Sequence, residues 1–485
     1  MAAAGRPRSS IWIGLGLAVV AAAAVRLPFL GTQSLWFDET FTRTVVRMPS
    51  IAGVWNQVKA TEATPPLYYL LTWGWLKLFG SDSDGALRAV SALASVACVP
   101  AAFAAARRFV GDPAALATAA IAAVSPILVG HALEARAYSL LALLALVSIW
   151  TMGRVLERAT PARFAAWALA AAAALWTHYF AAFVVGAEVC VLLRGLPAAR
   201  LRTLGWSALV AALFAPVLTV LARQGDSQIA PAGSGSIFDR LWHATRELAM
   251  GANVPNAGLE GAGLALAVGG LAVGTAVALR RGGGARVPLA LAAIAIGLPF
   301  LLSAAQVFNG APHELFLARN LMMAWGCLAA VAALGLLRLR VVPLAAYLAV
   351  CLVAVLWSNS DWHYRNTDWR GAAQVLVPRA TGRPIVAYPT FNTPVARRYL
   401  GRRVAHGAVA ASDLWVLIEP GREAGRSLGP LPLPRLAAGF ERVRELDYRG
   451  FRLLELRSAR PLPVSVDSFG QDVHGQLPVV LAANG

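Results

Sequence analysis

Long apolar runs separated by short polar segments dominate the first 358 residues of the chain. Most runs are roughly 18–22 residues long, which is the length of helix that crosses the hydrocarbon core of a bilayer. A helix also satisfies its own backbone hydrogen bonds, which lipid cannot do. The pattern therefore predicts a polytopic α-helical membrane protein.

Basic residues predict how the runs are oriented. Arg6 and Arg8 precede the first run, so the positive-inside rule places the N-terminus in the cytoplasm. The first run resembles a signal peptide, but it continues to Leu30 without a cleavage site and is counted as a span. Alternating spans then bring almost every Arg cluster to the cytoplasmic side. Eleven spans are predicted, at residues 10–30, 87–106, 113–130, 137–156, 162–177, 180–194, 203–222, 259–279, 287–307, 320–337 and 342–357.

The segment 66–80 is apolar, but its helical part is too short to cross a membrane comfortably. Its Trp and Tyr side chains suit the interface between lipid and water, and Pro66 suits the start of a helix. We therefore expect a juxtamembrane helix here. Counting it as a span would move all later Arg clusters to the outer side.

The composition changes at about residue 359, where ordinary charged residues return. We expect a membrane domain over 1–358 and a small α/β soluble domain outside the membrane over 359–485. Its predicted elements are helices at 369–377 and 395–400, strands at 384–388 and 414–419, a hairpin at 441–456 that turns at Gly450, and a weakly ordered tail after Arg460.

Composition supports this class. Hydrophobic residues make up 58% of the chain and charged residues 14%, with a mean hydropathy of +0.60, and soluble domains are far more polar. The net charge of +18 comes mostly from Arg clusters beside apolar runs, which favours anionic lipid and not nucleic acid as the partner. The four cysteines lie inside apolar runs without metal spacing, so no disulfide framework is expected.

Two adjacent acids, Asp38 and Glu39, follow the first span. An acid in such a place can be a solvated helix end and nothing more. Here Trp36, Phe37 and Phe41 flank the pair and hold it against apolar surface. This setting favours a functional site.

Under the predicted topology, other polar segments reach the same outer side. Charged groups at membrane depth cost about 2.5–3.5 kcal/mol each on insertion scales, so a functional role is the first hypothesis. The alternatives are a loop-end ion pair for Glu134 and Arg136, a helix-end histidine for His178, and a snorkelling arginine for Arg319. The candidate substrate-contacting residues are Glu62, Tyr68, His131, Glu134, Arg136, Tyr138, His178, Tyr179 and Arg319, with His313 and Glu314 nearby.

These residue types suit one kind of ligand, a lipid phosphate that carries a sugar. Arginine binds phosphate oxygens through its planar guanidinium, aromatic rings stack on sugar and prenyl chain, and a carboxylate accepts the proton of an acceptor hydroxyl. The sequence identifies no certain cofactor. A divalent metal could bind through Glu62 or His178, although no ligand spacing demands one.

Five short segments in order carry a resemblance to a known family. They are Leu35–Glu39 (LWFDE), 62–69 (EATPPLYY), 133–139 (LEARAYS), 177–180 (THYF) and 368–371 (DWRG). With these segments the chain resembles the GT-C superfamily of polyprenyl-phosphate-sugar-dependent glycosyltransferases. It is most similar to the bacterial branch of the protein O-mannosyltransferase and aminoarabinose transferase group.

The resemblance implies roles for particular residues. Asp38, in the first outer loop, would be the catalytic base, and Glu39 would assist or orient it. Relatives bind the lipid phosphate with basic residues of outer loops, and Arg136 and Arg319 are the candidates here. Two positions that are basic in some relatives hold Phe41 and Ala63 in this chain, so the phosphate contacts do not transfer residue by residue. The expected reaction is inverting sugar transfer from a polyprenyl-phosphate donor to a hydroxyl of a glycan, lipid or protein, on the extracytoplasmic side of a bacterial inner membrane.

Other function classes remain open at this stage. A lipid or solute transporter typically shows internal repeats and mid-membrane charges, whereas here the charges gather at one face. A lipid-linked glycan polymerase or ligase would be expected to use a large basic outer loop, and the loop 223–257 is modest. A purely structural subunit would not need so many outer-facing acids.

Overall fold

The structure is a computed structural model that describes residues 9–224, 236–308, 315–364, 366–388, 393–401, 403–405, 407–423, 426–430, 432, 437–471 and 477–482. The chain divides into two compact units. The first contains Met1–Leu30 and Phe41–Leu356, and the second contains Gly31–Thr40 and Trp357–Gly485. We call Gly31–Thr40 the acid loop, because it carries Asp38 and Glu39.

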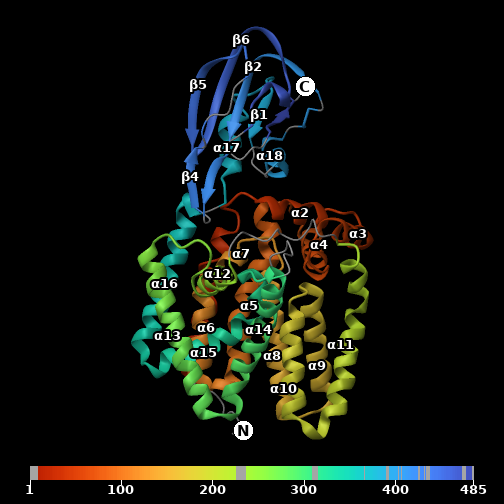
Figure 1. Cartoon of the computed structure of the whole chain (residues 1–485), viewed down its shortest axis with the longest axis vertical. Helices are drawn as coiled ribbons and strands as arrows, with labels where there is room; N and C mark the ends of the chain where they lie inside the picture. Colours follow the sequence, from red (N-terminus) through yellow and green to blue (C-terminus); the bar gives the residue numbers. More distant parts are fainter. Residues whose placement is uncertain are drawn as a thin grey trace. The chain divides into compact units, whose positions relative to one another are not determined.

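The first unit is helical, and its long helices run roughly parallel or antiparallel to one another (Figure 1). Its helices are α1 (Ser9–Ala24), η1 (Leu27–Phe29), α2 (Phe37–Val46, which begins in the acid loop), α3 (Ile51–Thr61), α4 (Leu67–Phe79), α5 (Asp84–Val110), α6 (Asp112–Val124), α7 (Pro126–Ala132), α8 (Tyr138–Glu157), α9 (Pro161–Thr177), α10 (Ala181–Gly195), η2 (Pro197–Ala199), α11 (Arg200–Leu221), α12 (Ile237–Met250), α13 (Ala257–Arg281), η4 (Gly283–Ala285), α14 (Arg286–Phe308), η5 (Ala318–Ala324), α15 (Trp325–Arg338) and α16 (Val341–Ser360).

A helix occurs at each of the predicted spans. Within the described residues, eight helical segments are long and apolar enough to cross a membrane, and a ninth is added if α6 and α7 form one bent span. The predicted spans 162–177 and 180–194 correspond to α9 and α10, which have 17 and 15 residues. The polytopic helical class predicted from the sequence is confirmed.

The bend between α6 and α7 measures 49° and lies at Ser125 and Pro126. Proline suits the first position of a helix but cannot donate the hydrogen bond that would continue the preceding one. The polar segment from His131 to Arg136 begins in the last turn of this short second helix. The bent helix pair therefore leads from an apolar stretch into a charged turn.

Helices α4 and α12 are among the short helices that lie outside the candidate spans. Helix α4 has 13 residues and ends at Gly80, whose φ of 64° suits a helix C-terminus. Helix α12 was not predicted, and it divides the region that the sequence suggests to be a loop. Ser236 and Asp239 form a reciprocal cap at its start.

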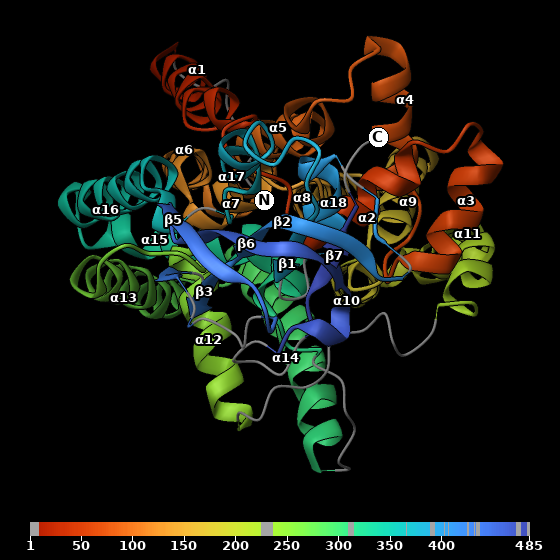
Figure 2. The same cartoon turned by 90° about the horizontal axis from the view of Figure 1, so that it is seen from above.

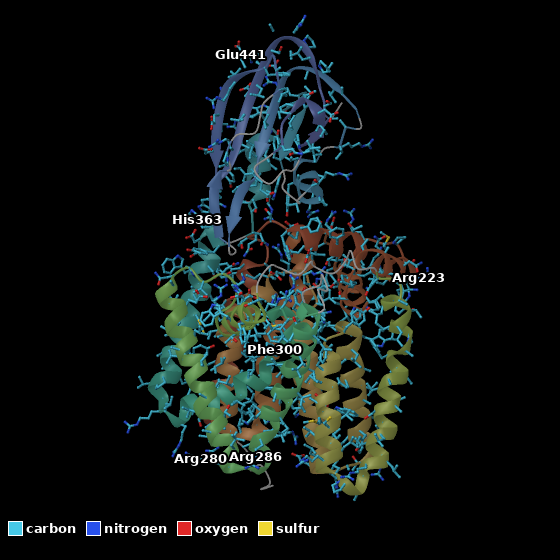
Figure 3. The ribbon with its side chains drawn as sticks, in the orientation of Figure 1. Arg223, Arg280, Arg286, Phe300, His363 and Glu441 are labelled. Atoms are coloured by element: carbon cyan, nitrogen blue, oxygen red, sulfur yellow. The ribbon has the colours of Figure 1, made fainter. Side chains whose placement is uncertain are left out.

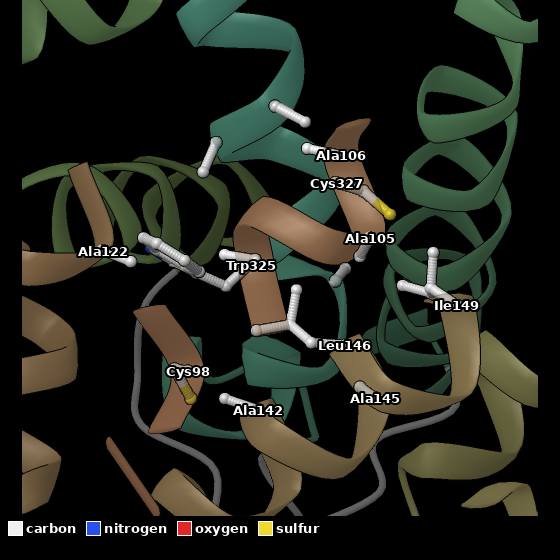
Figure 4. Packing of buried hydrophobic residues seen from close by; sticks show 14 of the residues in the cluster. Cys98, Ala105, Ala106, Ala122, Ala142, Ala145, Leu146, Ile149, Trp325 and Cys327 are labelled. Carbon is white, nitrogen blue, oxygen red and sulfur yellow. The ribbon is translucent and has the colours of Figure 1, made fainter. Parts of the chain in front are cut away.

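Small residues let the helices approach closely. Seen from above, α13, α15 and α16 form one group and α9, α10 and α11 another (Figure 2). Gly270 and Gly274 of α13 face Gly335 of α15, and a Cβ added at Gly335 would overlap the carbonyl oxygen of Gly270. Deeper in this unit, Leu146 of α8 lies among buried residues that include Cys98 and Trp325 (Figure 4).

We expect Gly335→Ala to destabilise the membrane unit by about 1–3 kcal/mol, because α13 and α15 must move apart. The control is Gly269→Ala on α13, where an added Cβ meets no atom within 4 Å. Thermal unfolding of the detergent-solubilised protein should show a lower Tm for the first variant only. Equal Tm values would contradict the close helix contact.

The second unit has a five-stranded sheet in the order β5-β6-β2-β1-β7. Strands β1 and β2 are parallel and are joined through a helix, whereas β2 with β6, β6 with β5, and β1 with β7 are antiparallel. Its elements are η6 (Trp362–Tyr364), α17 (Trp369–Leu376), β1 (Ile385–Tyr388), α18 (Thr393–Leu400), β2 (Val409–Ile418), β3 (Pro420–Glu423), β4 (Arg426–Pro430), β5 (Glu441–Tyr448), β6 (Phe451–Val464), η7 (Val466–Ser468) and β7 (Val479–Leu481).

The predicted helices, strands and hairpin of this unit are confirmed, including the turn at Gly450, where φ is 83°. The prediction of a weakly ordered tail after Arg460 is wrong for part of this stretch. Strand β6 runs to Val464, and β7 pairs with β1. The proline-rich composition of this stretch suggested a weakly ordered segment. In addition, β7 is only three residues long, which is too short for an alternating pattern to be recognised.

Candidate functional site

Arg136 and Glu62 form a buried ion pair in the first unit. Arg136 Nη1 lies 2.9 Å from Glu62 Oε2, and the two residues are 8% and 2% exposed. The same nitrogen donates to Thr42 Oγ1 at 3.4 Å. Glu62 follows α3, and Arg136 lies in the turn after α7, so the pair joins segments that are far apart in the sequence.

Tyr69 extends this pair, although the sequence analysis did not select it. Its hydroxyl donates to Glu62 Oε2 at 2.6 Å and lies 2.8 Å from Thr64 Oγ1. Burial raises the pKa of Tyr69 well above its usual range, so the hydroxyl stays protonated. The predicted Tyr68 instead contacts Ser91, whose hydroxyl donates to the backbone carbonyl of Arg136.

A second polar group lies in the turn between α7 and α8. His131 Nδ1 is 3.0 Å from Glu134 Oε2, and the His131 ring is 4.8 Å from that of Tyr138. Burial alone would raise the pKa of Glu134, but the hydrogen bond from His131 and the charges of His131, Arg319 and Arg136 lower it. Glu134 is therefore ionised. Glu134 lies in the turn that precedes α8, which begins at Tyr138.

His178 closes the group from the end of α9. Its ring is 5.9 Å from that of Tyr138, and its Nδ1 accepts the Phe180 N–H at 3.2 Å. Burial, with the charges of Arg136 and Arg319, lowers the pKa of His178 to about 3. The ring is therefore neutral, with a proton on Nε2. The predicted Tyr179 instead donates its hydroxyl to Gln224 at 2.8 Å.

Arg319 stands in the sequence between two residues that line an apolar cavity. It lies in η5, and its charge acts on both Glu134 and His178. Phe316 and Leu321, on either side of Arg319, line a cavity of about 230 Å³ whose walls are almost entirely apolar. The hydroxyl of Tyr347 in this wall donates to a backbone carbonyl at 2.9 Å. The cavity thus suits a hydrocarbon chain.

Asp38 and Glu39 lie in the first turn of α2, which suits the positive end of a helix dipole. Glu39 is fully buried, and its Oε2 accepts the backbone N–H of Trp36 at 3.1 Å. This contact is the reach-back half of a capping box. Glu39 therefore has a structural task at the helix start, whereas Asp38 is partly exposed.

Within the described residues, no group of three or more His, Cys, Asp or Glu side chains is arranged to hold a metal ion. Glu62 and His178 each have other partners: Glu62 pairs with Arg136 and Tyr69, and His178 accepts from a backbone amide. His313 and Glu314 lie outside the described residues.

The neutral state of His178 predicts a pH effect on stability. The unfolded chain takes up a proton at this histidine below pH 6.5, and the folded protein does so only near pH 3. The free energy of unfolding should therefore decrease as the pH is lowered, by about 2 kcal/mol between pH 7.5 and 5. His178→Asn keeps an acceptor for the Phe180 N–H but does not titrate. The apparent Tm of the variant should fall less over this range, and an unchanged pH slope would contradict the assignment.

Comparisons with known proteins agree with the resemblance that the five sequence segments carry. Residues 63–221 match the model of the family described as dolichyl-phosphate-mannose-protein mannosyltransferase. A search of curated protein sequences gives no significant match.

Solved structures show the same fold. The crystal structure of ArnT from Cupriavidus metallidurans in the apo state matches with a TM-score of 0.59 at 13% identity, over 92% of this chain and 97% of that one. The structure of the same protein bound to undecaprenyl phosphate matches with a TM-score of 0.54 at 14% identity, over 92% and 98%. The chain therefore has an ArnT-like GT-C membrane fold, and the resemblance inferred from its sequence is confirmed.

Proposed function

We propose that the protein is a membrane glycosyltransferase that transfers a sugar from a polyprenyl-phosphate donor to an acceptor hydroxyl. The observation that carries the proposal is the Arg136–Glu62–Tyr69 cluster, together with Arg319, in a chain that has the fold of ArnT. The match to a structure with bound undecaprenyl phosphate supports the donor class.

Arg136 and Arg319 are proposed to hold the donor phosphate. A phosphate on a polyprenol becomes a good leaving group when its charge is neutralised, and fixed guanidinium groups do this without reorganisation. Glu62 and Thr42 hold Nη1 of Arg136 and so set the direction of its guanidinium plane. The neutral His178 offers its Nε2–H as a further donor to a phosphate or sugar oxygen.

The apolar cavity is proposed to take part of the prenyl chain. Its volume of about 230 Å³ holds only a segment of such a chain, so the rest would lie in the surrounding lipid. Because η5 carries Arg319 between two cavity-lining residues, a lipid with its phosphate at Arg319 can place hydrocarbon beside Phe316 or Leu321.

Asp38 is proposed as that base. It would accept the proton of the acceptor hydroxyl while this oxygen attacks the anomeric carbon and the phosphate departs with its bonding electrons, which inverts the configuration. Asp38 lies in the first turn of α2 and is partly exposed, so an acceptor hydroxyl can reach its carboxylate.

The chemistry is proposed to take place on the extracytoplasmic side of a bacterial inner membrane. Arg280 and Arg286 lie at one end of the helices of the first unit, and Arg223 lies at the opposite end (Figure 3). A pair of arginines beside α13 and α14 favours the cytoplasm for the first end. The polar turns that follow α7 and α9 would then open to the outer side.

The test is a turnover assay with purified protein, a synthetic polyprenyl-phosphate sugar and candidate acceptors. We expect free polyprenyl phosphate and glycosylated acceptor to appear in equal amounts. A protein that moves the donor across a liposome membrane without consuming it would be a transporter, and the proposal would be wrong.

A further inference from the structure

We infer that the C-terminal domain positions the acid loop, and with it Asp38, through the side chains of Arg370 and Tyr399. The inference rests on the proposed function insofar as Asp38 is the base. Its starting point is the segment Asp368–Gly371, which the sequence analysis singled out and which the proposed chemistry does not use.

Arg370 binds the acid loop with its side chain and its backbone. The guanidinium donates from Nη1 to the carbonyl oxygen of Gly31 at 2.6 Å and from Nη2 to that of Gln33 at 3.2 Å. The backbone N–H of Arg370 donates to Ser34 Oγ at 3.0 Å. A planar fork that spans two carbonyls fixes the direction of the chain as well as its place.

Tyr399 of α18 binds the next residue of the loop. Its hydroxyl accepts the backbone N–H of Leu35 at 2.7 Å, and the guanidinium of Arg370 lies 5.9 Å from its ring centroid. The backbone N–H of Asn366 adds a bond to Gln33 Oε1 at 3.2 Å. Helices α17 and α18 and the segment before α17 thus all contact the acid loop.

The rest of the segment holds Arg370 in place. Asp368 Oδ1 caps α17 by accepting the N–H of Gly371 at 3.0 Å, while Oδ2 accepts from the hydroxyl of Tyr448 at 3.0 Å and from Arg449 Nη1 at 2.6 Å. A Cβ on Gly371 would overlap the Tyr448 hydroxyl. Trp369 is 1% exposed and anchors the helix in the core of the domain.

These contacts lie directly before the proposed base. Leu35 is 1% exposed and stands three residues before Asp38, and α2 begins at Phe37. The Glu39 carboxylate also accepts a hydrogen bond from the Trp36 N–H. A general base must lie within hydrogen-bond reach of the proton it accepts, and a misplacement of about 1 Å can cost about 100-fold in rate. Loosening the loop should therefore reduce turnover rather than donor binding.

The test uses the full-length protein with two variants and a control. Tyr399→Phe removes only the hydroxyl, and Arg370→Gln removes the fork. Arg457→Gln is the matched control, because it breaks an exposed ion pair with Asp413 in the same domain. We expect hydrogen exchange of the acid-loop peptides to rise roughly three- to tenfold in both variants. In Arg370→Gln we expect kcat to fall about tenfold or more with an unchanged KM for the lipid donor. The control should change neither quantity.

Unchanged exchange of the acid loop in both variants would overturn the inference, whatever the activity. Raised exchange with full kcat would also overturn it, because the contact would then be structural only. If the wild-type protein transfers no sugar to any acceptor, the proposed function fails, whereas raised exchange in the variants would still show that the domain holds the loop.

Discussion

Replacing Asp38 by Asn is expected to lower kcat for sugar transfer by about 10²–10⁴-fold, which is the usual contribution of a general base. The amide keeps the size of the carboxylate but cannot accept the proton of an attacking hydroxyl. Asp38 is partly exposed in the first turn of α2, so the variant should fold and insert normally. Release of free polyprenyl phosphate, followed by chromatography, measures the loss.

Two further variants make the result specific. Asp82→Asn changes an exposed carboxylate that pairs with Arg43 and Arg47, and it should leave kcat unchanged. Glu39→Gln keeps an acceptor for the Trp36 N–H, since Gln also serves in capping boxes, and should cost much less than Asp38→Asn. Wild-type transfer by Asp38→Asn would remove this residue from the role of base.

Replacing Arg136 by Gln is expected to abolish measurable donor turnover and to destabilise the protein by about 3–5 kcal/mol. Breaking a buried ion pair from one side leaves the other charge without compensation. Here Glu62, at 2% exposure, would keep Tyr69 as a hydrogen-bond donor but lose its cation. Thermal unfolding in detergent and the turnover assay measure the two effects.

The double variant Glu62→Gln/Arg136→Gln separates stability from function. Two neutral amides should recover most of the lost stability, because no buried charge is left alone. Turnover should not recover, since the phosphate still lacks its guanidinium. If the double variant regains both stability and activity, the pair is only structural, and phosphate binding must rest with other groups such as Arg319.

Much of the fold could be predicted from the sequence, because the length of apolar runs is set by the bilayer. Helices were expected and found at every span, and the short helix α4 was recognised from its length. Helix α12 was missed because it contains many polar residues and because the segment before it is rich in Gly and Ser, which is typical of a loop. Strand β7 was missed because three residues carry no periodicity.

The sequence predicts which residue types make up the polar site, but it predicts only some of the contacts between them. Glu62, Arg136, His131, Glu134 and His178 are polar residues that the helix ends bring together in one group. The sequence selected Tyr68 where Tyr69 contacts Glu62, because two adjacent tyrosines on a helix differ by about 100° in direction. Only the packing of α4 on α5 decides which of them faces the charges.

Neither sequence segment alone predicts that the acid loop binds the C-terminal domain. Gly31–Leu35 and Asp368–Tyr399 are more than 300 residues apart, and the bonds between them go mostly to backbone groups. Bonds to backbone groups require no particular side chain, whereas Gln33 and Ser34 contribute side-chain acceptors from the loop. The motif at Asp368–Gly371 could therefore be noticed, but its partner could not be named.

The most direct test of the account is an experimental structure of the protein with a polyprenyl phosphate bound. We expect the phosphate within hydrogen-bond distance of the guanidinium groups of Arg136 and Arg319, with prenyl carbons in the cavity beside Phe316 and Leu321. A phosphate bound away from both arginines, with this cavity empty of lipid, would contradict the proposed site.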